Sequence, residues 1–371
     1  MPQLHSQGVG HANRKTLRFP EGWETTLLSP IWTSARGGVR GDYTGRMRPL
    51  ASSLRLAALL LLSTLAAPAC FGWGSDGHRM INRIAMEKLP TDVPAFLRAS
   101  ATLDEIEYLG PEPDRWRSPA EPELSSAQAP EHFIDLEIAD RIGPLPRKRF
   151  EFLAALNELA QRRPDWAKDL RPERVGLQPY VTVEVYERLK AAMREYRSLV
   201  AKHEDTRPVE QAIVFYAGWL GHYVGDGSMP LHVTVNYDGW VNPENPNGYT
   251  TQHGIHALFE STFVSANIHA GDVAPLVSAA KPLADPFDDY LAYLRHSATQ
   301  IERVYQLEKA QALAGAGTAE SRQFVAERLA AGAAELRDLI YTAWIESAKP
   351  VPEFHGTPKP GSPAPITKPG Y

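Results

Sequence analysis

The sequence predicts a mainly α protein with a single multi-helix domain over residues 73–349. Apolar residues recur at helical spacing in several long stretches, which is the pattern of amphipathic helices. Strands are not indicated, because runs of alternating apolar and polar residues are sparse. The hydrophobic fraction of 43% and the charged fraction of 22% are those of an ordinary soluble globular domain.

The expected helices follow one another along the domain, with loops between them. They span residues 78–89, 147–162, 183–203, 209–226, 253–267, 286–307 and 319–349. Pro90 and Pro164 stop the first two, because proline cannot continue a helix. The stretch 236–251 is rich in Asn, Pro and Gly and predicts a long loop. Residues 350–371 are rich in Pro, Gly, Ser and Lys, which predicts a tail without regular structure.

Residues 47–72 have the pattern of a secretory signal peptide. Met47 and Arg48 precede an apolar run at 56–67, and small residues follow it up to Gly72. The run is short for a bilayer span, and the alternative is a buried core helix. Because signals begin a precursor, we interpret residues 1–46 as a mis-called leader, with translation starting at Met47.

The signal peptide predicts an exported protein, periplasmic or secreted, with no transmembrane segment after signal removal. Cleavage after Gly72 makes Trp73 the new N-terminus. Cleavage after Ala69 would leave Cys70 first, as in lipoproteins. That interpretation is less favoured, because residues 67–69 lack the usual large aliphatic residue.

Charge and cysteine content restrict the function. The net charge of -5 gives no support for tight electrostatic binding to duplex nucleic acid. Cys70 is the only cysteine, so neither a disulfide framework nor a thiolate zinc site can form. Any bound metal must be held by His, Asp, Glu and backbone groups, and 12 histidines are present.

The segment 221–232 has the strongest pattern of metal ligands. His222 and Asp226 are four residues apart in a helical stretch, so both project from one face. Gly227 and Pro230 are expected to break the helix, and His232 follows the turn.

A second pair, His256 and Glu260, repeats the four-residue spacing on the next expected helix. One such pair alone is more often a solvated pair or a core contact. Two pairs close in sequence, together with His232, favour a metal site.

Two upstream segments contain ligand-type residues beside prolines. Asp135 follows His132 by three residues and is suited to fix the tautomer of an imidazole. The alternative is a short strand or turn with a structural histidine. In a Pro-rich loop, Asp114 is a candidate metal ligand and Arg117 a candidate phosphate ligand. The alternative there is a surface ion pair.

Trp73 and His78 open the expected mature chain. A free α-amine and the adjacent carbonyl of Trp73 can chelate a metal, provided that the signal is cut directly before this residue. The alternative is an aromatic anchor packed under the first helix.

Together these segments resemble the single-strand-specific zinc nucleases of fungi and plants, whose superfamily also contains bacterial zinc-dependent phospholipase C. The likeness covers residues 73–260 in its motifs. The order is specific: an N-terminal Trp, a His, an Asp, a His-x-x-Asp, a His-x-x-x-Asp with a later His, and a His-x-x-x-carboxylate. The resemblance implies the helical fold of that superfamily and a centre of three zinc ions.

The resemblance also implies how the ligands divide. The first zinc would be held by Asp114, His132, His222 and Asp226. The second would be held by His232, His256 and Glu260. The third would be held by the Trp73 amine and carbonyl, His78 and again Asp226, so that Asp226 bridges two ions.

The implied activity is zinc-dependent hydrolysis of phosphodiesters in single-stranded DNA or RNA, by attack of a metal-activated hydroxide on phosphorus. An additional 3′-nucleotidase activity is consistent with it. Arg117 corresponds to the family's phosphate-binding arginine, and Asp135 would orient His132 or the attacking water. Phe133 corresponds to a platform on which a base stacks. The alternative for Phe133 is an apolar packing residue.

Two residues depart from the nuclease pattern. Glu260 stands where phospholipase C members carry Glu and nucleases usually Asp, and Leu136 replaces a polar residue of the nucleotide pocket. The alternatives are therefore a phospholipase C-type hydrolase of lipid headgroups, or a non-catalytic zinc-binding protein of the same fold. No stable protein partner is implied.

Overall fold

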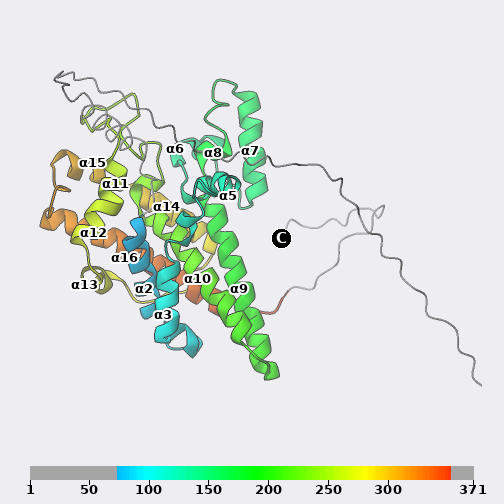
Figure 1. The fold of residues 1–371 in the computed structure, drawn as a ribbon. Coiled ribbons are helices and arrows are strands. Elements are labelled where there is room, and N and C mark those ends of the chain that lie inside the picture. Colours follow the sequence, from blue (N-terminus) through cyan, green and yellow to red (C-terminus); the bar gives the residue numbers. More distant parts are fainter. Residues whose placement is uncertain (1–72, 352–371) are drawn as a thin grey trace, which may run out of the picture. The chain divides into compact units, whose positions relative to one another are not determined.

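The computed structural model describes residues 73–351 (Figure 1). The predicted leader and signal peptide, and all but the first two residues of the predicted tail, lie outside this range. Within it there is no β-strand, and only two isolated bridges join Ile134 to Gly176 and Tyr237 to Gly239. The predicted mainly α class is confirmed. Every helix in the described range is too short or too polar to cross a membrane.

Helix α10 (Arg207–Ser228) forms the centre of the helical packing (Figure 1). It packs against α9 (Gln178–Lys202), α16 (Ala319–Glu346), α2 (Gly74–Glu87) and α3 (Ser100–Leu109). All residues from 220 to 228 are buried, which is the pattern of a helix enclosed on every side.

Glycines allow α2 to approach α10 closely. A Cβ atom on Gly225 would lie 2.8 Å from Nδ1 of His78, and one on Gly221 would collide with Asn82. Glycine inside a helix costs about 1 kcal/mol relative to alanine. Here the cost is offset by packing, because the close approach places His78 directly against the face of α10 that carries His222 and Asp226.

The predicted long helices exist, with two internal differences. The stretch 253–267 consists of α11 (Ile255–Ala257), a π-helical turn η5 (Leu258–Thr262) and α12 (Phe263–Asn267). The stretch 286–307 is divided into α14 (Pro286–Ala298) and α15 (Ile301–Lys309). Gly227 does not break α10, which continues to Ser228. A Cβ there would lie 2.7 Å from the hydroxyl of Tyr290, so this glycine serves packing.

Shorter elements fill the connections. Helix α3 and the short helices were not predicted, because they contain too few turns to show a period. The predicted helix over 147–162 is α7 (Arg149–Arg162). The remaining elements are η1 (Ala95–Arg98), α4 (Glu112–Arg115), α5 (Pro122–Gln128), η2 (Ala129–His132), α6 (Leu136–Ala139), η3 (Asp140–Ile142), α8 (Pro172–Val175), η4 (Pro230–His232), α13 (Ala270–Val273) and η6 (Ala274–Leu276).

Candidate metal centre

Eight side chains predicted as metal ligands converge in the interior, and each is at most 5% exposed. They come from seven elements, because α10 contributes two. The side chains are His78 on α2, Asp114 on α4, His132 on η2, His222 and Asp226 on α10, His232 on η4, His256 on α11 and Glu260 on η5. Donor atoms from this set form three groups, each compact enough to hold a metal ion.

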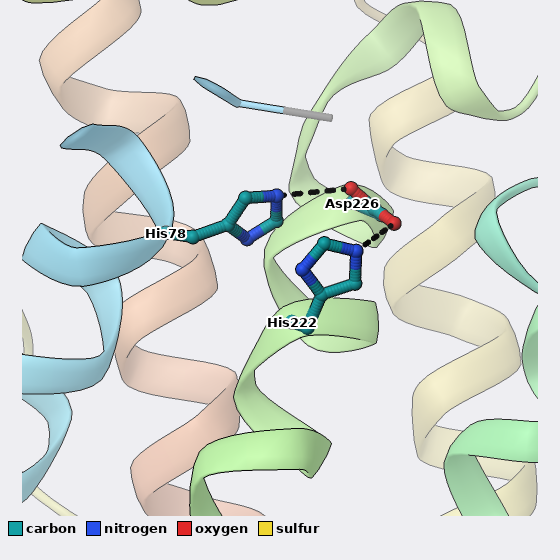
Figure 2. Close-up of side chains that lie close together, drawn as sticks. All are labelled: His78, His222 and Asp226. Atoms are coloured by element: carbon teal, nitrogen blue, oxygen red, sulfur yellow. Dashed lines mark ion pairs between the residues drawn. The ribbon is translucent and has the colours of Figure 1, made fainter. Parts of the chain in front are cut away.

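The first group joins His78 to the two α10 residues His222 and Asp226 (Figure 2). Nε2 of His78 lies 3.3 Å from Oδ1 of Asp226, and Nε2 of His222 lies 3.4 Å from Oδ2. The two imidazole rings stack with their centroids 4.0 Å apart. The carboxylate of Asp226 therefore directs one oxygen to each histidine.

The second group consists of Asp114, His132 and His222. Nδ1 of His132 lies 3.0 Å from Nε2 of His222 and 3.2 Å from Oδ2 of Asp226. Oδ1 of Asp114 is 3.8 Å from both imidazoles. Asp114 was expected in a loop, but it lies in the one-turn helix α4 and is buried rather than part of a surface ion pair.

The third group consists of His232, His256 and Glu260. The Nε2 atoms of the two histidines are 3.2 Å apart, and Oε2 of Glu260 lies 2.9 Å from Nε2 of His256 and 3.6 Å from Nε2 of His232. The π-helical turn begins between His256 and Glu260. Such widened turns occur frequently at functional sites.

Backbone carbonyls fix the tautomers of three of these histidines. Nδ1 of His222 donates to the carbonyl of Gly110 over 2.9 Å, and Nδ1 of His232 donates to that of His132 over 2.7 Å. Nδ1 of His256 donates to the carbonyl of Tyr237 over 3.0 Å. Because a carbonyl can only accept, the proton of each neutral imidazole is on Nδ1, and the Nε2 lone pair then faces its group. This is the usual arrangement around metal-binding histidines.

The polar atoms of the centre are not satisfied by the protein alone. Among the described residues, several buried nitrogen and oxygen atoms of these side chains have no hydrogen-bond partner. They include Nε2 of His78 and of His132, Oδ1 of Asp114 and of Asp226, and both carboxylate oxygens of Glu260. Buried polar atoms are normally paired, since leaving one unpaired costs about 1–3 kcal/mol. Nitrogen and carboxylate oxygen atoms collected in this way fit a borderline-soft cation such as Zn²⁺.

Burial and neighbouring charges prepare these groups for a cation. Burial lowers the pKa of His132 to about 4 and the pKa of His222 well below its usual value, so both imidazoles are neutral near pH 7. Burial alone would raise the pKa of Asp226, but the surrounding histidines hold it well below its usual range, and among them His232 has its own pKa raised to about 9 by Asp226 and Glu260 against the effect of burial. Burial and the nearby Asp226 raise the pKa of Asp114.

Trp73 is fully buried beside the first group. Its indole N–H donates to the hydroxyl of Ser228 over 2.6 Å, and its ring packs at 5.6 Å from that of Phe259. The side chain is therefore an aromatic anchor, one of the two roles expected from the sequence. Its backbone has φ 24 and ψ 12, a strained conformation for a bulky residue.

The expected substrate-contacting residues lie close to the centre in sequence and space. Nη1 of Arg117 is 3.8 Å from Oδ1 of Asp114. Phe133 is half-buried and is not among the hydrophobic residues packed against the core, whereas the neighbouring Leu136 is part of it. Burial and the nearby Glu137 raise the pKa of Asp135 to about 7. The expected contact between Asp135 and His132 is not present in the described residues, where His132 faces Asp226 and His222 instead.

Three positioning residues were not predicted. The amide of Gln178 donates to the carbonyls of His132 (3.4 Å) and Tyr223 (3.1 Å), and the hydroxyl of Tyr223 donates to Glu131 (3.1 Å). These bonds connect η2, α9 and α10 behind the histidines. In the sequence, Glu131 and Tyr223 are each next to a predicted ligand. That position is the signal that could have identified them.

A helical domain that encloses three groups of buried His, Asp and Glu donors, each of which could hold a metal ion, is consistent with a metal-dependent enzyme. The sequence matches the model of the S1/P1 Nuclease family over residues 73–355, and the chain belongs to this family. The family is one of nucleases, which are phosphodiester hydrolases. Comparison with curated proteins and with solved structures gave no match.

Proposed function

We propose that the chain is an exported, zinc-dependent phosphodiesterase that hydrolyses single-stranded DNA or RNA. The observation that carries the proposal is the set of three adjacent donor groups inside a chain of the S1/P1 nuclease family. Nitrogen and oxygen donors without thiolates suit zinc, and three groups suit three ions. When bound, zinc would supply positive charge that polarises a phosphoryl group and acidifies water.

The proposed ligand assignment is the one expected from the sequence, although the geometry places one histidine in two of the groups. His222 lies close enough to serve both the group with His78 and the group with Asp114 and His132. We assign it to the latter, because Nε2 of His222 is nearer to His132 (3.0 Å) than to Asp226 (3.4 Å). Asp226 then bridges to His78, and the Trp73 α-amine completes that third site.

The strain at Trp73 supports this role for its amine. The structure has Trp73 at φ 24. After cleavage before Trp73 this torsion no longer exists, so the strain would be released while the buried indole stays bonded to Ser228. Export, with removal of residues 47–72, is therefore part of the proposal.

The other residues act on the substrate. Arg117, beside Asp114, would donate its guanidinium N–H groups to a phosphate oxygen. Asp135, with its pKa raised to about 7, would hold or release a proton near neutral pH and orient the water. The half-buried ring of Phe133 would stack on a base without selecting its identity. Such a site would accept both DNA and RNA. Hydrolysis of 3′-nucleotides is a second activity to test on the same protein.

A nuclease assay tests the proposal. The protein that begins at Trp73 is incubated with heat-denatured DNA, with and without a chelator, and in parallel with phosphatidylcholine micelles. We expect small oligonucleotides from DNA, loss of activity with chelator and recovery with added Zn²⁺. Release of phosphocholine without DNA cleavage would support the phospholipase C alternative. Zinc binding without either activity would support a non-catalytic role.

A further inference from the structure

The segment 141–174 has a charge opposite to that of the whole chain. It contains nine Arg and Lys against five Asp and Glu, a net charge of +4 in a chain of net charge -5. It includes α7, the turns that follow it and α8. Figure 1 shows α7 and α8 near α5 and α6 in one part of the described fold. We call residues 141–174 the basic segment.

The basic segment ends directly beside the candidate metal centre. The backbone N–H of Asp135 donates to the carbonyl of Val175 over 2.8 Å, and the N–H of Leu177 donates to the carbonyl of Pro130 over 2.6 Å. These bonds hold the end of α8 on both sides of His132 and Phe133. The guanidinium of Arg174 is near enough to Asp135 to oppose the rise of its pKa that burial causes.

Several cations of the basic segment are exposed and available to a ligand. Arg162, Lys168 and Arg174 are exposed, and none makes an ion pair within the described part of the chain. Arg171 pairs only with Glu173, at 3.5 Å, and both side chains are more than half exposed. Exposed pairs of this kind contribute little free energy, so they compete weakly with a phosphate.

Trp166 holds the turn after α7 in a defined conformation. The guanidinium of Arg163 lies 3.6 Å from the centre of its indole ring, and that of Arg141 lies 4.9 Å away. These cation–π contacts fix two flat guanidinium groups at the surface before any ligand binds. A surface ordered in advance loses less conformational entropy on binding.

We propose that the basic segment is the docking surface for the phosphate backbone of a single-stranded nucleic acid whose scissile phosphate lies at the metal centre. The proposal rests on the proposed function and assigns a polymer, rather than a small phosphate ester, as the substrate. A positively charged surface that follows the backbone, with aromatic side chains on which bases stack, is the typical architecture of single-strand binding.

A membrane surface fits these residues less well. Among the described residues of the basic segment, Phe150 is the one large hydrophobic side chain that is exposed, at 81%. Interfacial binding to lipid needs a broad apolar face beside the cations. A single exposed ring is instead sufficient to stack on one base.

The test removes three charges from the basic segment without touching the centre. The variant is Arg162→Gln, Lys168→Gln, Arg171→Gln. The matched control is Lys88→Gln, Arg98→Gln, Lys202→Gln, which removes three exposed cations at the ends of α2, η1 and α9. Both are compared with the unchanged protein on oligothymidylate of about 30 nucleotides, longer than the roughly 4–16 nucleotides that one binding module covers. The small ester bis(p-nitrophenyl) phosphate reports the centre alone.

The proposal predicts that the basic-segment variant loses about threefold or more of kcat/KM on the oligonucleotide at low salt. The dependence of log kcat/KM on log salt should become shallower by about 0.7 for each phosphate that the variant no longer neutralises. Hydrolysis of the small ester should be unchanged, and the control should behave as the unchanged protein.

Equal losses in the variant and the control would overturn the proposal, and so would an unchanged salt slope. A third result is that the basic-segment variant loses binding to vesicles of equal parts phosphatidylserine and phosphatidylcholine while it still binds the oligonucleotide. That result would overturn the proposal in favour of a membrane surface. Oligonucleotide binding by fluorescence anisotropy is measured in parallel. If the unchanged protein binds the oligonucleotide but does not cleave it, the proposed function fails, and the comparison of the variants still decides the docking surface.

Discussion

The indole N–H of Trp73 donates a hydrogen bond to the hydroxyl of Ser228 over 2.6 Å, across 155 positions of the sequence. This bond ties the first described residue to the last turn of α10, two residues after Asp226. It thereby fixes where the backbone of Trp73 lies relative to His78 and Asp226, and so where a free α-amine would be placed after cleavage.

Ser228→Ala should destabilise the protein by about 1–3 kcal/mol, because a buried indole N–H then has no acceptor. The free energy of unfolding is measured by denaturant titration. Adding Trp73→Phe removes the donor, so the penalty of Ser228→Ala should shrink in that background. Equal penalties in both backgrounds would show that the hydrogen bond does not contribute.

Asp226→Asn should reduce bound metal and lower activity on denatured DNA by at least about 100-fold. The carboxylate serves two groups, and loss of even an outer partner of a metal ligand costs about 10–100-fold. Metal content is measured by mass spectrometry beside activity. The control Glu195→Gln changes an exposed carboxylate on α9 and should retain both. Full activity of Asp226→Asn would remove this residue from the centre.

Phe133→Ala should raise KM for an oligonucleotide by a factor that corresponds to about 1–3 kcal/mol, the contribution of one stacked base. Hydrolysis of a small ester without a base should not change. Phe133→Trp keeps a stacking surface and should restore KM. If the alanine variant instead unfolds at lower denaturant with KM unchanged, Phe133 is a packing residue.

Glu335 on α16 should make stability depend on pH. Burial, with Asp338 and Asp289 nearby, raises the pKa of Glu335 from 4.5 to about 8, and its Oε1 atom has no hydrogen-bond partner. Between these values the unfolded chain is ionised at this residue while the folded chain keeps the proton. Folding therefore takes up a proton, and the free energy of unfolding falls as pH rises through the window.

Denaturant titrations of Glu335→Gln across this window check the prediction. The variant should lose that decline with pH. Glu327→Gln, at an exposed position of the same helix, should retain it. Identical slopes for Glu335→Gln and the unchanged protein would contradict the assignment.

Local sequence patterns predicted the features that depend on local geometry. The four-residue spacing of His222 and Asp226 reflects one turn of helix, and the structure places both side chains on one face of α10. The long helices were visible for the same reason. The break between α14 and α15 and the π-helical turn were not, because a change in backbone winding over a few residues leaves no distinct period.

Long-range features of the site could not be read from the sequence. His222 approaches two donor groups because glycines on α10 admit α2, and the sequence does not state which helix fills that space. Likewise, the bridge from Ile134 to Gly176 sets α8 beside Phe133, a contact between segments with no shared pattern. The ligand types were predictable from chemistry, whereas their neighbours depend on the packing of the whole domain.

Metal analysis of the protein that begins at Trp73 tests the central claim most directly. Three donor groups predict three zinc ions per chain, and a variant with one residue added before Trp73 should retain only two and lose most of its activity. Equal zinc content and activity in the two proteins would remove the α-amine from the centre. Fewer than two zinc ions in the correctly processed protein would contradict the metal centre itself.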